Sequence, residues 1–162
     1  MWAAGYSQEE LDRAQEEFGL VFPPDLVDLL RDRRPANGYD WRVDREKIRE
    51  MLAWPLKGML FDIEQNGFWM DEWGVIPERE ADRREIATAA VRAAPNLIPL
   101  VSHRYLPAEP SEPGNPVFSI YQTDIIYYGA NLEHYFQNEF GSWSSLEETA
   151  YRYIRFWSDI AG

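Results

Sequence analysis

The sequence predicts an α+β fold, a single domain in which helices flank a mainly antiparallel β-sheet. Apolar residues recur at helical spacing from Ser7 to Ala94, and between Leu97 and Tyr128 their period changes to two. Helical spacing then returns after Asn131. Helices and strands therefore come in separate blocks, which favours an antiparallel sheet over alternating βαβ units. A length of 162 residues suits one domain over residues 1–162.

Two helices are expected at the start of the chain. Ser7 and Glu10 have the spacing of a capping box before a helix that continues to Phe18, and Gly19 then ends it. A second helix begins near Pro23 and Pro24, where proline is tolerated in the first turn. Its buried side is expected to consist of Leu26, Val27, Leu29 and Leu30.

The middle of the chain predicts further helices. Asp44 is placed to cap a helix that Pro55 is expected to interrupt, and a short helix or apolar turn follows as far as Asn66 and Gly67. After the aromatic stretch FWMDEWG, Pro77 opens a long helix over residues 78–94, which stops before Pro95.

Three strands and two more helices complete the prediction. Residues 97–106 indicate one strand, with His103 and Tyr105 on one face and Arg104 on the other. Residues 117–121 and 125–128 predict a hairpin around Gln122, Thr123 and Asp124. Asn131 caps a helix that ends at Gly141. A C-terminal helix is expected over residues 146–160, with Tyr153, Ile154 and Trp157 turned inward.

The composition narrows the classes of function. The chain has no cysteine, which excludes disulfides and thiolate metal ligands and favours a reducing, cytoplasmic compartment. The N-terminus lacks the basic and apolar segments of a secretory signal, and no apolar run approaches the roughly 20 residues that cross a bilayer. A net charge of −12 repels nucleic acid and anionic lipid and attracts a basic partner, although it also serves solubility alone.

Two parts of the sequence carry a resemblance to a known family. The first is the opening helix, the turn Gly19-Leu20-Val21-Phe22-Pro23, the second helix and Asn37-Gly38. The second is the stretch from Asn96 to Phe136, with its Ile-Pro strand, its Gly114-Asn115 loop, its apolar hairpin and its LEHYF helix. Together they resemble the SUKH superfamily, which includes the fungal cell-wall assembly regulator and many bacterial immunity proteins. The resemblance covers about residues 7–140.

The resemblance implies a single α+β domain that binds another protein rather than catalysing a reaction. Bacterial members of this superfamily neutralise toxin domains, often nucleases, by covering them inside the cell. The expected partner is therefore a basic toxin domain, with no cofactor, no nucleic acid and no membrane involved. Neither the identity of the toxin nor the oligomeric state follows from the resemblance, and a housekeeping scaffold of the same fold remains an alternative.

The sequence contains no recognisable catalytic motif. The two histidines are 31 positions apart and form no metal-binding spacing, and there is no P-loop and no Gly-x-Ser-x-Gly. The remaining enzymatic alternative is a hydrolase or carbohydrate-active enzyme. It would use paired carboxylates among Glu64, Asp71, Glu72 and Asp124 beside Trp69 and Trp73.

Two groups of residues remain as candidates for a structural or a binding role. His103, Arg104 and Tyr105 are interpreted as a structural polar cluster, in which Arg104 pairs with Asp124 or Glu109. The predicted partner-binding residues are aromatic or acidic, because aromatic anchors and carboxylates suit a basic partner. They are Glu64, Trp69, Asp71, Glu72, Trp73, Asp124, Tyr127 and Tyr128.

Overall fold

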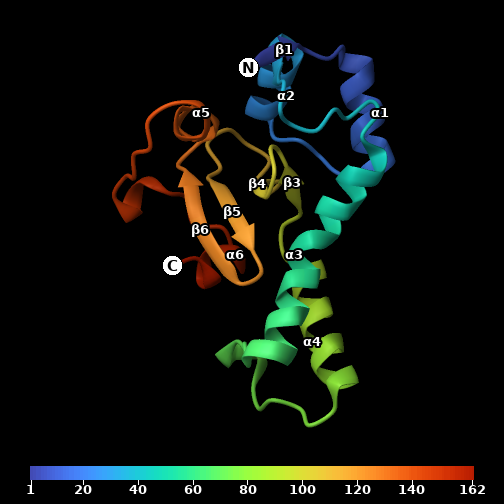
Figure 1. The fold of residues 1–162 in the computed structure, drawn as a ribbon, viewed down its shortest axis with the longest axis vertical. Coiled ribbons are helices and arrows are strands. Elements are labelled where there is room, and N and C mark those ends of the chain that lie inside the picture. The colour runs from blue at the N-terminus through green and yellow to red at the C-terminus, as the bar shows by residue number, and fades with distance from the viewer.

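A four-stranded antiparallel sheet with the order β3-β4-β5-β6 lies at the centre of the protein (Figure 1). A computed structural model describes residues 1–162. The strands of this sheet are β3 (Leu97–Pro99), β4 (Arg104–Pro107), β5 (Val117–Tyr121) and β6 (Asp124–Gly129). A second, two-stranded sheet pairs β1 (Trp2–Ala4) with β2 (Arg33–Pro35). The architecture is α+β, as the sequence predicted.

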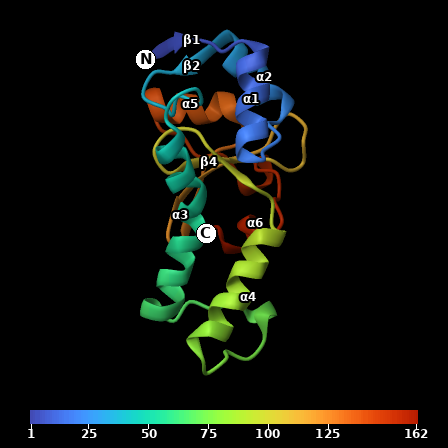
Figure 2. The same ribbon diagram turned by 90° about the vertical axis from the view of Figure 1, so that its right-hand side faces the viewer.

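Six α-helices surround the two sheets. They are α1 (Gln8–Phe18), α2 (Pro24–Asp32), α3 (Arg45–Asn66), α4 (Glu80–Ala93), α5 (Leu132–Phe140) and α6 (Trp157–Ile160), with 3₁₀ turns η1 (Asp71–Trp73) and η2 (Glu148–Ala150). Helices α1, α2 and α5 gather with β1 and β2 at one end, whereas α3 and α4 run side by side to the other end (Figures 1 and 2). None of these helices has the length and apolarity that crossing a membrane requires.

Local signals place several helix ends as predicted. The Ser7 hydroxyl accepts a hydrogen bond from the Glu10 N–H at 3.1 Å, and the Glu10 carboxylate accepts one from the Ser7 N–H at 2.9 Å, so the capping box is formed. Gly19 ends α1 in the left-handed conformation, with φ of 64°. The Asn131 side chain caps α5 by accepting from the His134 N–H at 2.8 Å.

Helix α3 continues through Pro55, which corrects the prediction of an interruption there. Proline has no N–H and leaves the carbonyl four residues earlier without its helical partner. In this protein that carbonyl belongs to Met51, and it accepts a hydrogen bond of 2.6 Å from the Tyr105 hydroxyl on β4. The helix survives because a strand residue supplies the missing donor.

The predicted single strand over residues 97–106 is instead two antiparallel strands, β3 and β4, joined by a tight turn. Ser102 has φ of 49°, a conformation that serine rarely adopts, and its carbonyl accepts a hydrogen bond of 2.6 Å from the Tyr39 hydroxyl. No glycine, proline or asparagine marks this turn in the sequence. The assignment of residues 97–106 to two faces of one strand was therefore wrong.

The predicted C-terminal helix over residues 146–160 is also wrong, because only η2 and the four residues of α6 are helical. The Arg152 guanidinium donates to Asn115 Oδ1 at 2.7 Å and to the Pro113 carbonyl at 3.0 Å, which holds the segment in an extended form. Ile154 and Trp157 are buried as predicted, but Tyr153 is 62% exposed.

Two hydrophobic clusters form the core. One lies among α1, α2, α5 and the adjoining ends of the strands, and the other lies between the sheet, α3, α4 and the C-terminal segment. The face of the sheet that packs against α3 and α6 carries Tyr105, Phe118 and Ile120. The bonds that α3 makes with this sheet position the α3–α4 hairpin, whose far end projects beyond the core (Figure 2).

Candidate protein-binding surface

The connection between α3 and α4, residues 67–79, forms the end of the molecule farthest from β1 (Figures 1 and 2). We call this connection the tip. It contains four of the predicted partner-binding residues, namely Trp69, Asp71, Glu72 and Trp73. Glu64 lies just before it, on the last turns of α3.

Packed aromatic rings and short-range hydrogen bonds hold the tip in one shape. Trp69 and Trp73 contact each other edge to face with ring centroids 4.9 Å apart, and Phe68 meets Trp73 at 6.2 Å. The Trp69 indole N–H donates to the Gly74 carbonyl at 2.9 Å. The 3₁₀ turn η1 adds a hydrogen bond from the Trp73 N–H to the Met70 carbonyl at 3.0 Å. The tip is therefore an ordered loop.

Arg83 on α4 ties the second half of the tip to α3. Its guanidinium donates to both carboxylate oxygens of Glu64, at 2.7 and 2.9 Å, and to the carbonyls of Pro77 at 3.0 Å and Glu78 at 2.8 Å. The hydrogen bonds from Arg83 lower the pKa of Glu64. Glu64 thus supports the tip and is not a free carboxylate for a partner.

The exposed surface of the tip is acidic and apolar. Asp71 and Glu72 are exposed, and residues 67–79 contain three acidic residues and one basic residue, Arg79, which pairs with Asp82 of α4 at 2.9 Å. Val75 is 93% exposed and Ile76 is 53% exposed. Apolar side chains that an ordered loop exposes make the tip a candidate surface for binding another protein.

The C-terminal segment extends this surface toward the sheet. Phe156 stacks on Trp73 with centroids 6.5 Å apart, and the Tyr153 hydroxyl donates to the Asp159 carboxylate at 2.7 Å. That hydrogen bond, with burial and the nearby charges of Asp159 and Glu72, raises the pKa of Tyr153. Tyr153 and Asp159 thus adjoin the tip, although sequence reasoning left both out of the site.

Tyr127 lies on the side of the sheet that faces the C-terminal segment, but its side chain packs against the core. Its ring stacks between Phe118 and Tyr151, with centroids 5.1 and 4.5 Å away, and its hydroxyl donates to Ser158 Oγ at 2.8 Å. It therefore supports the C-terminal segment from beneath.

Asp124 and Tyr128 lie on β6, outside the tip. Asp124 is exposed at the β5–β6 turn. Tyr128 lies under the Arg104 guanidinium, 4.0 Å from its ring centroid, and contacts Trp143 at 4.8 Å. The eight predicted residues therefore do not form one continuous surface.

His103 and Arg104 lie against each other rather than on opposite faces of a sheet. Arg104 Nη1 is 2.7 Å from His103 Nε2 and donates to Ser119 Oγ at 3.0 Å. The carboxylate near Arg104 is Glu139, at 3.5 Å, and not Asp124 or Glu109 as predicted. Burial and the charge of Arg104 lower the pKa of His103. A neutral imidazole accepts from Arg104 at Nε2 and donates at Nδ1 to Ser102 Oγ, 3.1 Å away.

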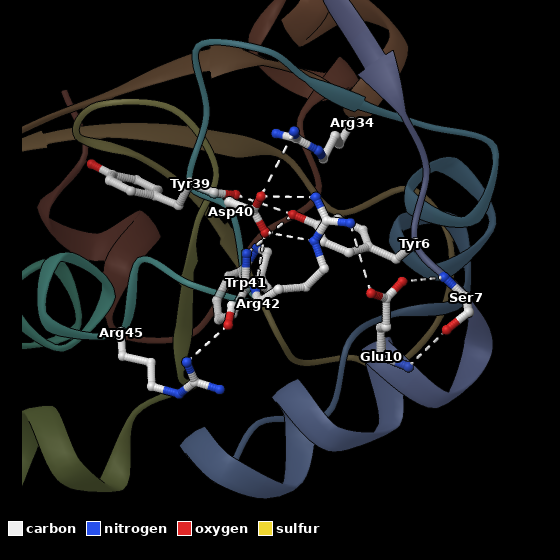
Figure 3. A network of polar contacts seen from close by, with 9 residues as sticks. All are labelled: Tyr6, Ser7, Glu10, Arg34, Tyr39, Asp40, Trp41, Arg42 and Arg45. Carbon is white, nitrogen blue, oxygen red and sulfur yellow. Dashed lines mark hydrogen bonds and ion pairs between the residues drawn. The ribbon is translucent and has the colours of Figure 1, made fainter.

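A second polar network, which sequence reasoning missed, lies at the opposite end of α3 (Figure 3). Arg42 donates to both oxygens of Asp40 at 3.0 and 2.9 Å, and Arg34 approaches Asp40 at 3.7 Å. The side-chain hydrogen bonds from Arg42 lower the pKa of Asp40. The network joins α1, β2 and the start of α3 through Tyr6, Ser7, Glu10, Arg34, Tyr39, Asp40, Trp41, Arg42 and Arg45. Its ion pairs are intramolecular, which is typical of a structural role, although the buried Arg34 Nε makes no hydrogen bond.

The carboxylates considered for catalysis have different surroundings. Glu64 lines a hollow of about 230 Å³ with Trp69 and Arg83, and Arg83 neutralises it there. Asp71, Glu72 and Asp124 are exposed. No group of three or more His, Cys, Asp or Glu side chains is placed to hold a metal ion. Comparisons with family models, curated proteins and solved structures find no match to this chain.

Proposed function

We propose that this protein is a non-catalytic binding protein of the immunity type, which acts in the cytoplasm and neutralises a basic toxin domain by covering it. The observation that carries the proposal is the tip, an ordered loop that presents Val75 and Ile76 between exposed carboxylates. The SUKH-like pattern of the sequence and the net charge of −12 support the same partner class.

The tip suits this role because its shape is set before the partner arrives. Arg83, Trp69 and Trp73 already hold it through hydrogen bonds and ring contacts, so little conformational entropy is lost on binding. Asp71 and Glu72 speed the approach of a basic surface, and Val75 and Ile76 then bury apolar area against it. A nuclease is the toxin class we favour, because its nucleic-acid site is basic.

The direct test is a binding and inhibition assay with the basic toxin domain encoded beside this protein. Titration is expected to give saturable binding and loss of toxin activity. Val75→Asp, which places a charge in the apolar contact, is expected to weaken binding at least tenfold. Val43→Asp is the matched control, because Val43 is 68% exposed and lies just before α3, at the end of that helix away from the tip.

Two results would overturn the proposal. One is the absence of binding to the neighbouring toxin and to any basic nuclease domain. The other is equal loss of affinity in the Val75 and Val43 variants, since the tip would then have no special role.

A further inference from the structure

Residues 142–150, which we call the strap, follow α5 and are all exposed. We propose that the strap is a pH-sensitive device, closed while the His134 imidazole on α5 is neutral and open once that imidazole binds a proton. No residue of the strap belongs to the candidate protein-binding surface at the tip, so this proposal does not depend on the function proposed above.

The strap is held to the rest of the protein by hydrogen bonds at one residue. Ser144 is the only residue of the strap that hydrogen-bonds outside the segment from Gly141 to Tyr151. Its N–H donates to Asn138 Oδ1 at 2.9 Å, and its carbonyl lies 3.0 Å from His134 Nε2. Because so few hydrogen bonds hold it, the strap can open while the sheet stays folded.

The partners of His134 determine which ring nitrogen carries the proton. The Ala130 N–H, which can only donate, lies 2.9 Å from His134 Nδ1, so Nδ1 is an acceptor without a proton. A neutral imidazole has one N–H, which is therefore on Nε2 and donates to the Ser144 carbonyl. Ser144 Oγ is a second oxygen close to Nε2, at 3.1 Å. The closed strap thus requires the neutral ring with its proton on Nε2.

Protonation of the ring is incompatible with this arrangement. A proton on Nδ1 would point at the Ala130 N–H, so two donors would face each other at 2.9 Å. His134 is only 8% exposed, so the charged ring gains water only by moving outward, which also breaks its bond to Ser144. The open strap leaves Nδ1 free to bind a proton and the closed strap does not. The population of the open strap therefore rises as the pH falls.

Charged side chains near His134 form no ion pair with its imidazole. Histidine is the side-chain type that ordinarily changes its charge between about pH 5 and about pH 8, so the ring itself is the group that responds in this range. The titratable and charged groups on the elements around the ring are Arg104 of β4, Tyr128 of β6, Glu133 and Glu139 of α5, and Glu147 and Glu148 of the strap.

Opening of the strap uncovers part of the sheet. Trp143 of the strap packs on the Tyr128 ring, with centroids 4.8 Å apart, and the Arg104 guanidinium lies 4.0 Å from the centroid of the same ring. When the strap leaves, Trp143 leaves with it. Acid therefore makes accessible an aromatic ring beside a guanidinium, a pair that the closed strap covers.

The test is NMR of the ¹³C,¹⁵N-labelled full-length protein between about pH 8 and about pH 5. Two-bond ¹H–¹⁵N correlations of the His134 ring are expected to show the Nε2–H tautomer at the upper pH. As the ring takes up its proton, the Ala130 and Ser144 amides should shift with the same midpoint, and the ¹H–¹⁵N NOE of residues 142–150 should fall. A one-proton switch changes the ratio of open to closed strap by at most about tenfold per pH unit.

Two variants identify the titrating group. His134→Asn supplies an amide oxygen that can accept from the Ala130 N–H but does not titrate, so the NOE of the strap should no longer depend on pH. His103→Gln leaves His134 as the only histidine and is the matched control, which should respond to pH as the wild type does.

Four results would overturn the proposal. They are an Nδ1–H tautomer at the upper pH, a ring that stays neutral down to about pH 5, strap NOEs that do not follow the ring, and an unchanged pH response in His134→Asn. Loss of the central-sheet signals together with those of the strap would also contradict a local device, because acid would then unfold the whole protein. If His134→Asn does not fold, the titration of the wild-type ring and strap still decides.

Discussion

The Tyr105 hydroxyl donates a hydrogen bond of 2.6 Å to the carbonyl of Met51, the group that Pro55 deprives of its helical donor. Tyr105 is fully buried, and burial raises the pKa of its hydroxyl, which therefore stays protonated and able to donate. Tyr105 of β4 therefore supplies the hydrogen bond that Pro55, the only proline inside α3, cannot make.

Tyr105→Phe is expected to lower the free energy of unfolding by about 1–3 kcal/mol, because it leaves the buried Met51 carbonyl without a partner. In a Pro55→Ala background the new N–H reaches that carbonyl, so the same change is expected to cost about 1 kcal/mol less. Urea denaturation of the four proteins in this cycle measures the difference. An identical cost in both backgrounds would disprove the compensation.

Asp62 on α3 holds the β5–β6 turn, since its carboxylate accepts the Thr123 N–H at 2.8 Å as well as bonds from the Thr123 hydroxyl and the Asn66 amide. Burial alone would raise the pKa of Asp62, but these hydrogen bonds outweigh it and lower the pKa overall. Asp62→Asn is expected to cost about 1–3 kcal/mol at neutral pH.

The lowered pKa also sets the pH dependence of that cost. A carboxyl with a depressed folded pKa stabilises the protein above its unfolded pKa of about 3.9, and the contribution disappears as the pH falls through the folded value. The stability difference between wild type and Asp62→Asn should therefore be constant from pH 7 to about 5 and shrink below about pH 4. The exposed Asp28→Asn variant is the control, and a difference that grows in acid would contradict the account.

Gly58 lets α3 touch the β5–β6 turn, because a Cβ at this position would lie 2.7 Å from Cα of Gln122. Alanine in a helix is normally more favourable than glycine by roughly 0.5–1 kcal/mol. Here Gly58→Ala is expected to destabilise the protein by about 1–3 kcal/mol through overpacking. Thermal unfolding beside the exposed Lys57→Ala variant checks the sign, and a stabilised Gly58→Ala protein would show that the turn yields.

Arg83→Met is expected to loosen the tip and leave the sheet unchanged, because it removes the bonds to Glu64 and to the Pro77 and Glu78 carbonyls. Hydrogen exchange should speed up at the Phe68, Trp73 and Gly74 amides, whose hydrogen bonds lie within the tip and its junction with α3. The control is Arg92→Met, which replaces an exposed residue of the same helix and should leave hydrogen exchange unchanged in both the tip and the sheet. Faster exchange throughout the sheet would mean that Arg83 supports the whole fold.

Asp71→Lys combined with Glu72→Lys is expected to slow association with a basic toxin domain about tenfold at low salt and to flatten the dependence of the rate on salt. The matched control is Glu46→Lys with Glu50→Lys on α3, which changes the net charge equally at an exposed site away from the tip. Equal slowing in both proteins would show that overall charge, rather than the tip, steers the partner.

Local sequence signals account for much of the fold. Ser7 with Glu10, Gly19, Asn131 and the Gln122-Thr123 turn each act over a few neighbouring residues, and the structure confirms all of them. The wrong predictions fall where a contact with a residue far away in the sequence determines the local backbone structure. The Tyr105 hydroxyl keeps α3 intact at Pro55, and Arg152 draws the C-terminal segment toward Asn115 and out of a helix.

The same distinction applies to the candidate site. Trp69, Asp71, Glu72 and Trp73 are close in sequence, so one loop brings them together. Arg83 is 19 positions from Glu64, and no local pattern marks their pairing. Consecutive strand residues face opposite sides, so Tyr127 and Tyr128 were never able to serve one surface, which the period of the strand already implied.

Helix α3 is joined to the sheet along its length by Tyr105 at Met51, by the Trp54 indole at the Ile120 carbonyl, by Gly58 at Gln122 and by Asp62 at Thr123. Beyond Asn66 these connections stop. The helix and the sheet should therefore melt as one cooperative unit, whereas the connection to α4 belongs to a smaller unit that opens independently. A substitution in that connection can then alter the surface that we propose for partner binding without reducing the amount of folded protein, so the tip is free to diversify.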